Sequence, residues 1–227
     1  MTTKLFTALS MTALFLVACG PSEAEIQAKK DQAIADSLAV EAGKIVTYTI
    51  DPSASGVMWS GNMTGAKIYS HSGDMKVLKG EIITKGGILQ NGEFVVDMTS
   101  INPTDDGYSA DRPKENLMKH LASEEFFHVE KSPTASLTIL GVEGNIAKAE
   151  LTLRGKTDTE TITEIEMATS DDGTVTATGK MTFDRQKYGV AFPGPAKDLV
   201  IANNIDMIVK LTGKANSVPG ESRGSVR

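Results

Sequence analysis

Histidine is the residue type in this chain best suited to metal binding or acid–base catalysis, and there are three. His71, His120 and His128 show no tight local spacing of the kind that zinc sites use. We therefore expect no metal centre. His71 precedes a glycine of a predicted turn, which favours a structural role or a polar contact at one end of the fold.

Adjacent carboxylates are the second group that could support acid–base chemistry. The pairs are Asp105-Asp106, Glu124-Glu125 and Asp171-Asp172. All fall in predicted turns or at helix starts, where acidic side chains serve as caps and turn formers. No predicted strand leads into a Gly-x-Ser-x-Gly nucleophile elbow, because the match at Gly220–Gly224 lies in the C-terminal segment that lacks an apolar pattern, and no glycine-rich phosphate loop appears. We therefore expect neither an enzyme nor a bound cofactor.

Cys19, the only cysteine, follows an apolar run over residues 5–18 that begins after a single basic residue, Lys4. This pattern is typical of a secretory signal, and the run is too short for a permanent membrane helix. Leu16-Val17-Ala18-Cys19 resembles the lipobox of bacterial lipoproteins. The resemblance implies a signal peptide over residues 1–18 and a diacylglycerol thioether on Cys19. Such an anchor would tie the mature chain to a membrane of the bacterial cell envelope.

The charge of the chain limits its partners. The formal net charge is −6, and Lys and Arg form no dense cluster. This argues against binding to nucleic acid and against electrostatic adsorption to anionic lipid. We expect membrane association to come from the anchor alone.

Residues 19–43 differ in composition from the rest, being rich in Ala, charged residues and helix formers. Ser22 followed by Glu25 is typical of a capping box, and Gly43 is a suitable stop. We expect a helical or flexible stalk. Its apolar residues are too few for a coiled-coil seam, and a homodimer stays open. These residues are Ile26, Ile34 and Leu38.

Residues 44–214 show the period-two alternation of half-buried strands. The clearest segments are 45–51, 57–62, 94–99, 137–140, 149–154 and 205–212. Turn signals separate them at Gly86-Gly87, Asn91-Gly92, Gly144-Asn145 and Asp171-Asp172-Gly173. Many short antiparallel strands predict a sandwich or a barrel. Residues 215–227 lack an apolar pattern, so we expect a disordered tail.

One segment, residues 112–121, has a helical pattern with Pro113 suited to a first turn. Ser123 is expected to cap a second short turn. The apolar side chains of this region could pack across one end of a barrel, and they are Leu117, Leu121, Phe126 and Phe127. A small basic cluster could bind a polar head group such as pyrophosphate. The alternative is an exposed helix face with Lys paired to Glu115. The cluster comprises Arg112, Lys114 and Lys119.

Residues 115–135 resemble the HL-x-S-x-x-FF-x-V-x-K-x-P-x-A stretch of the YceI-like family. Further motifs follow the family's order: Tyr48-x-Ile50-Asp51, Trp59, His71-Ser72-Gly73, Gly80, Gly92-x-Phe94-x-Val96-Asp97-Met98, Leu151-Thr152-Leu153-Arg154-Gly155 and Phe183-Asp184-Arg185-x-Lys187-Tyr188-Gly189. The resemblance covers residues 44–214. It departs at Ala54-Ser55, where many members have His-Ser, and at Arg112, which no acidic residue directly follows.

The resemblance implies an all-β fold, an eight-stranded antiparallel lipocalin-like β-barrel with a short helical segment near one end. It also implies that the lumen binds a long apolar molecule, a polyisoprenoid or fatty acyl chain, for storage or transport. The residues expected to face the lumen are Trp59, Phe94, Val96, Met98, Leu151, Leu153, Met181, Phe183 and Met207. The candidates for a head-group contact are His71, Arg112 and Lys114.

Two other readings stay open at this point. Eight strands can enclose a lumen that side chains fill, which would make the domain a structural or interaction lipoprotein without a ligand. The weaker alternative is an envelope enzyme acting at the barrel mouth. The methionines after Cys19 favour an adaptable apolar lining. They are Met58, Met63, Met75, Met98, Met118, Met167, Met181 and Met207.

Overall fold

The computed structural model describes residues 22–64, 68–194 and 200–216. The chain divides into two compact units on either side of the bond between Glu41 and Ala42. Cys19, the predicted signal peptide and nearly all of the predicted tail lie outside the described residues.

Helix α1 (Glu23–Gly43) is exposed along its length and buries no residue. Its first turn is closed by the predicted capping box: the Glu25 N–H donates to the Ser22 hydroxyl at 3.2 Å, and the Ser22 N–H donates to the Glu25 carboxylate at 2.8 Å. Side-chain hydrogen bonds four residues apart, such as Gln27 to Asp31, add support on the helix surface. None of the helices in the described part of the chain is long and apolar enough to cross a membrane.

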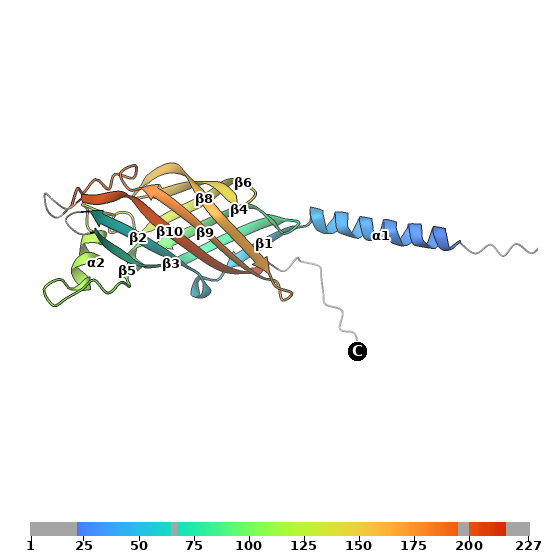
Figure 1. Cartoon of the computed structure of the whole chain (residues 1–227), viewed down its shortest axis with the longest axis horizontal. Coiled ribbons are helices and arrows are strands. Elements are labelled where there is room, and N and C mark those ends of the chain that lie inside the picture. The colour runs from blue at the N-terminus through green and yellow to red at the C-terminus, as the bar shows by residue number, and fades with distance from the viewer. Residues whose placement is uncertain (1–21, 65–67, 195–199, 217–227) are drawn as a thin grey trace, which may run out of the picture. The chain divides into compact units, whose positions relative to one another are not determined.

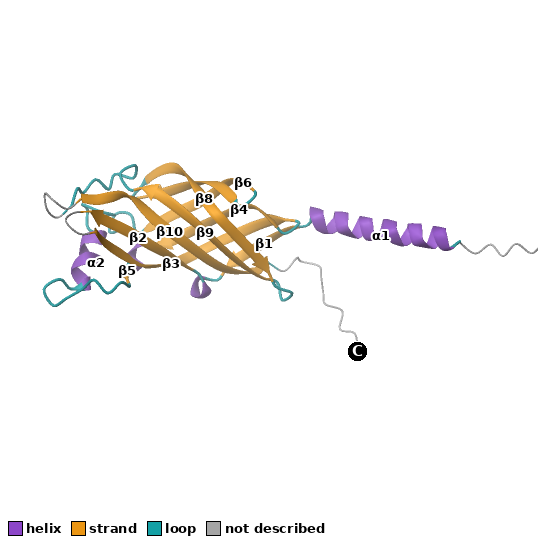
Figure 2. Ribbon diagram, viewed as in Figure 1, coloured by secondary structure: helices purple, strands orange, loops and turns teal. Residues whose placement is uncertain are grey.

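The second unit is a closed eight-stranded antiparallel barrel, which confirms the predicted fold class (Figures 1 and 2). Its strands are β1 (Ile45–Ile50), β2 (Gly56–Thr64), β3 (Ile68–Lys85), β4 (Ile88–Asp97), β6 (Thr134–Glu143), β7 (Ile146–Leu153), β8 (Lys156–Thr169), β9 (Thr174–Asp184) and β10 (Val200–Ala215). From β2 to β10 each of these strands pairs with the next, and β10 closes the sheet by pairing with both β9 and β2. A two-residue strand, β5 (Asn102–Pro103), adds to the edge of β3.

β1 and β2 together fill one strand position of the barrel. The short helix η1 (Pro52–Ala54) separates them, and the Asp51 carboxylate caps it by accepting from the Ser53 N–H at 2.8 Å. β2 pairs with the first half of β3, whereas β1 pairs with the second half of β3 and with the end of β10. The broken strand therefore completes the barrel at its far end.

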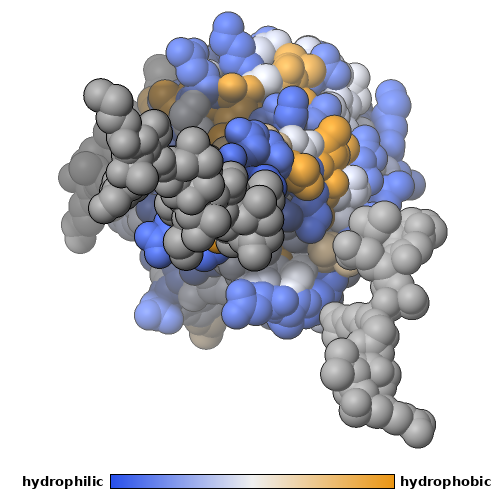
Figure 3. Space-filling model, turned by 90° about the vertical axis from the view of Figure 1, so that its right-hand side faces the viewer, coloured by the Kyte–Doolittle hydropathy of each residue, from blue (hydrophilic) through white to orange (hydrophobic). Residues whose placement is uncertain are grey.

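The predicted alternation places apolar side chains inside the barrel. Along β7, Ala149 and Leu151 are buried while Lys148 and Glu150 are exposed. On the face that Figure 3 shows, polar and charged residues cover most of the coloured surface, and hydrophobic residues interrupt it in separate spots (Figure 3). Met58 was expected among the lining methionines, but its side chain points outward and is 37% exposed, so it does not contribute to the lumen.

One predicted turn is wrong. Asn91 and Gly92 lie inside β4, where Gly92 pairs with Ile82 of β3. The chain reverses earlier, at Gly86-Gly87, because both glycines adopt positive φ angles of 56° and 78° that suit a tight hairpin turn. A side chain at Gly92 would meet the Phe94 ring at 2.9 Å, so this glycine makes room inside the barrel.

Helix α2 (Lys114–Ala122) lies at one end of the barrel together with β5, and we call this end the α2 end (Figure 1). As predicted, Leu121 and Phe126 are buried in the core and Leu117 and Phe127 pack against it. Ser123 does not cap the following turn by its side chain, because its hydroxyl donates to the His120 carbonyl at 2.8 Å.

Arg185 fixes the chain at the end of β9. Its side chain is 1% exposed, and its guanidinium donates to three backbone carbonyls, those of Ala202 at 3.0 Å, Val190 at 2.6 Å and Ile201 at 3.1 Å. A cation that is buried without such acceptors would be strongly unfavourable. The residue therefore joins the turn after β9 to the start of β10.

We expect Arg185→Met to lower the free energy of unfolding by about 3 kcal/mol, because three charge-assisted hydrogen bonds are lost and the carbonyls lose their donors. Urea denaturation measures this. Lys148→Met, on the exposed face of β7, serves as the matched control and should change stability by about 0.5 kcal/mol or less. Equal effects of the two substitutions would contradict the role assigned to Arg185.

Candidate functional site

A cavity of about 380 Å³ occupies the barrel from the α2 end inward, and we call it the main cavity. Helix α2 and the turn after it cover one side of it, through Leu117, Leu121 and Phe126. Its volume lies in the range of about 300–1,000 Å³ that is typical of small-molecule sites. Side chains therefore do not fill the lumen, which differs from the alternative expectation of a filled barrel.

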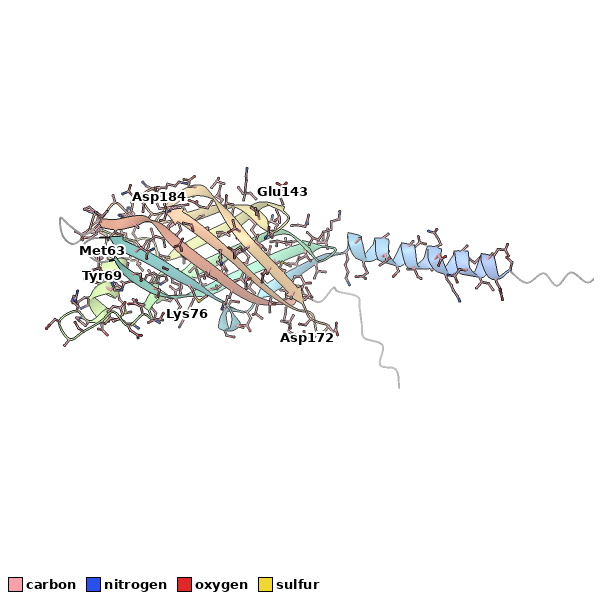
Figure 4. All side chains as sticks on the ribbon, in the orientation of Figure 1. Met63, Tyr69, Lys76, Glu143, Asp172 and Asp184 are labelled. Atoms are coloured by element: carbon pink, nitrogen blue, oxygen red, sulfur yellow. The ribbon has the colours of Figure 1, made fainter. Side chains whose placement is uncertain are left out.

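The lining of the main cavity is almost wholly apolar. Among the described residues that line it, none is Asp, Glu, Lys or Arg. The polar groups are those of Asn62, Tyr69, His71, His120 and the Trp59 indole. Tyr69 lies at the α2 end beside Met63 of the neighbouring strand (Figure 4). The cavity thus favours a mainly hydrocarbon occupant with few polar atoms.

A second, inner cavity of about 80 Å³ lies on the far side of the main cavity. It is lined by Ile82, Leu89 and Phe94, among others. Five residues line both spaces and form a waist between them: Val57, Val96, Leu137, Met181 and Val209. Four of these are stiff or branched, whereas Met181 has an unbranched, flexible side chain.

The structure brings together the residues expected to face the lumen. Those that line the main cavity are Trp59, Val96, Met98, Leu151, Leu153, Met181, Phe183 and Met207. Phe94 instead lines the inner cavity, because its position on β4 lies farther from the α2 end, opposite Gly80 of β3. That any of them binds a ligand stays a prediction.

The three head-group candidates are not brought together. His71 lines the main cavity, whereas Arg112 and Lys114 do not. Arg112 is exposed, and the Lys114 ammonium donates to the Asn102 side-chain carbonyl at 2.8 Å. Arg112 and Lys114 lie beside or at the start of α2 in the sequence, but neither side chain reaches the main cavity.

A polar cluster that the sequence did not indicate surrounds His71. The Asp105 carboxylate lies 3.1 Å from His71 Nδ1 and accepts from the Tyr108 hydroxyl at 2.8 Å. The Ser72 and Gly107 N–H groups also donate to it, both at 3.1 Å. Asp105 was assigned to a turn, and only the folded loop brings it beside a residue that is distant in sequence. A Tyr three residues after an Asp was the one available signal.

The same hydrogen bonds set the ionisation of the cluster. Burial alone would raise the pKa of Asp105, but the hydrogen bonds from Ser72, Tyr108, His71 and Gly107 outweigh it and hold that pKa at about 2. Burial, together with the hydrogen bond to Asp105 and its charge, raises the pKa of the Tyr108 hydroxyl. Asp105 is thus a carboxylate and Tyr108 a neutral donor at any physiological pH.

The second histidine of the cavity has apolar surroundings. The His120 ring on α2 contacts Phe192 edge-on at 4.6 Å between centroids and Phe126 at 5.4 Å. Across residues 22–64, 68–194 and 200–216, no group of three or more His, Cys, Asp or Glu side chains is placed to hold a metal ion.

The sequence profile of the YceI-like domain matches residues 48–213 of the chain. Among curated proteins, no relative is found.

Several solved structures are similar to the barrel. BcnA of Burkholderia cenocepacia superposes with a TM-score of 0.54 at 17% identity, covering 72% of this chain and 98% of that one. This likeness supports the fold. A polyisoprenoid binding domain from Saccharophagus degradans has a TM-score of 0.47 at 12% identity, covering 74% and 98% of the two chains. A YCEI protein of Campylobacter jejuni has a TM-score of 0.38 at 16% identity, covering 58% and 75%.

The low pKa of Asp105 predicts a pH dependence of stability. Its folded pKa of about 2 lies below the ordinary 3.8, so its contribution is complete above about pH 4 and is lost as the pH falls toward 2. Between about pH 4 and pH 2 the wild type should therefore lose more unfolding free energy than Asp105→Asn, which has no carboxyl group to protonate at this position. We expect a difference of about 1 kcal/mol between the two losses, after allowance for solvent screening. Urea denaturation at several pH values tests this, and parallel curves for the two proteins would contradict it.

Proposed function

The chain belongs to the YceI-like domain family, and on that premise we propose that its barrel holds a long apolar molecule, of the polyisoprenoid or fatty acyl type, for storage or transport. The observation that carries the proposal is the main cavity, a space inside the barrel with an apolar lining and no Asp, Glu, Lys or Arg among its described residues. Each methylene group that moves from water into such a space contributes about 0.8 kcal/mol.

The volume favours a slender chain. At about 30 Å³ per water-sized group, 380 Å³ accommodates on the order of a dozen carbon-sized groups. A longer chain would extend past the waist into the inner cavity or keep its remainder at the α2 end. Cavity-lining methionines such as Met63, Met98 and Met207 can adapt their side chains to such an occupant.

We further propose that the protein is a lipoprotein of the bacterial cell envelope, anchored through Cys19. The lipobox-like Leu16-Val17-Ala18-Cys19 supports this, as does the absence of any second cysteine. Two or three acyl chains would give stable attachment to a membrane.

The direct test is native mass spectrometry of the full chain followed by organic extraction without hydrolysis. Extraction then releases only noncovalent lipid, so acyl groups on Cys19 do not contribute. We expect a discrete additional mass in the lipid range. A ligand-free mass that stays unchanged after incubation with polyprenyl and acyl lipids would contradict the proposal.

A cavity-filling substitution links that lipid to the lumen. Ala135 is buried on β6 and lines the main cavity, so Ala135→Phe should place a ring in the space of the ligand. We expect about tenfold less bound lipid, equivalent to about 1.4 kcal/mol. Thr134→Phe, at the exposed neighbouring position, is the matched control and should retain the wild-type amount. Thermal denaturation confirms that both variants fold, and normal lipid content in folded Ala135→Phe would place the ligand elsewhere.

Cys19→Ser tests the anchor separately from the cavity. Without the thiol no thioether can form, so the variant should lose labelling by fatty acid and move from the membrane fraction to the soluble fraction. Fractionation and intact-mass measurement report both effects. Unchanged membrane attachment of the variant would rule out this anchor.

A further inference from the structure

We propose that His71, held by Asp105 and Tyr108, binds the polar end of the ligand, and that this end is an uncharged group with a hydroxyl donor. The inference rests on the proposed function, since it concerns the occupant of the same cavity. The apolar lining selects the hydrocarbon part of that occupant and leaves its polar end unspecified.

The imidazole of His71 has one ring nitrogen, Nε2, that is available to bind a ligand. Nδ1 of His71 lies 3.1 Å from the Asp105 carboxylate and 3.3 Å from the Tyr108 hydroxyl. The Tyr108 ring stacks on the imidazole, with centroids 5.5 Å apart and planes inclined by 16°. The ring is thereby fixed in place on β3, and it lines the main cavity. Within the described part of the chain, Nε2 has no hydrogen-bond partner.

The partners of Asp105 decide which nitrogen carries the proton. An ionised carboxylate only accepts hydrogen bonds, so the Nδ1–H of His71 must donate to it. The Tyr108 hydroxyl spends its own proton on Asp105, to which it donates at 2.8 Å. It therefore does not donate to His71 Nδ1, and this nitrogen is free to carry a proton. In the form of the imidazole that carries its single proton on Nδ1, Nε2 keeps a lone pair. This atom is an acceptor suited to a ligand O–H group.

The charges around the cavity disfavour an anionic head group. Among the described lining residues there is no Lys or Arg, and the nearest formal charge to His71 is the Asp105 carboxylate. A phosphate or diphosphate brought to this point would lose hydration without gaining a cationic partner among the cavity-lining residues that the structure describes. A hydroxyl or phenol loses much less hydration and regains a hydrogen bond at Nε2.

The position of His71 also gives the ligand an orientation. His71 pairs with Gly61 of β2, two residues closer to the α2 end than the Trp59–Gly73 pair. The polar end would therefore lie toward the α2 end, and the hydrocarbon chain would run inward past Trp59 to the waist. Trp59 is the only tryptophan of the chain, so its fluorescence reports on occupancy.

Three probes of equal chain length test the proposal: farnesol, farnesene and farnesyl diphosphate. Each is titrated into the delipidated full chain while Trp59 fluorescence is followed. We expect farnesol to bind about 3- to 10-fold more tightly than farnesene, as one net hydrogen bond allows, and the diphosphate to bind most weakly. In His71→Phe the farnesol affinity should fall to that of farnesene, with farnesene unchanged. His120→Phe, which changes the other cavity histidine, should keep the wild-type ratio.

Asp105 is a positioning residue, because it acts on the ligand only through His71. Its substitution should change which probe is preferred, whereas the loss of a merely structural residue would weaken the binding of all probes alike. In Asp105→Asn the side-chain amide can donate to Nδ1, which shifts the imidazole proton to Nε2. The preference should then move from farnesol toward the aldehyde farnesal, which only accepts. Loss of affinity for both probes in equal proportion would overturn this assignment.

The outcomes separate the two proposals. Tight binding of farnesene and farnesol with the same ratio in wild type and His71→Phe would overturn the head-group site and leave the apolar cavity in place. Tighter binding of the diphosphate than of farnesol would overturn the uncharged class. Absence of binding by all three probes to wild type would overturn the proposed function itself, and with it this inference.

Discussion

Closure of the sheet through β10 is the constraint on which the rest of the structure depends. β10 pairs along most of its length with β9 on one side and with β2 and β1 on the other. Once the sheet is closed, alternate side chains of every strand must point into one shared space. The period-two pattern then becomes a division between an apolar lumen and a polar exterior, and no long edge stays open among the described strands of the barrel.

The cavity exists because several inward positions are small or unbranched. Gly61, Gly73 and Ala135 face the lumen, and a side chain at Gly73 would meet the Trp59 ring at 2.8 Å and the Asn102 carbonyl oxygen at 2.2 Å. Gly73 thus leaves the space that the large indole occupies. The wide α2 end and the narrow far end follow from this distribution of side-chain volume, and the waist marks the change between them.

Much of the barrel could be predicted because burial at every second residue leaves a direct trace in the sequence, as along β7. Local turn chemistry was less decisive: Asn91-Gly92 has a strong hairpin composition, yet the two positive-φ glycines at 86 and 87 set the reversal. The cluster at His71 could not be predicted, since Asp105 reaches it only through a loop whose path depends on β5 pairing with β3. Nor could the sequence show that Phe94 belongs to the inner cavity, because alternation fixes the facing of a residue and leaves its depth undetermined.

The broken strand has a mechanical consequence. β1 is hydrogen-bonded to β3 over Ile45–Thr49 and to β10 over Tyr48–Ile50, and its first residue lies at the end of the barrel opposite α2. A force applied at Ile45 along the axis of β1 loads these bonds in shear, so they share the tension and none can open alone. A pull across that axis would instead separate them one after another. The resistance of the barrel to a tug on the segment before Ile45 therefore depends on the direction of the tug.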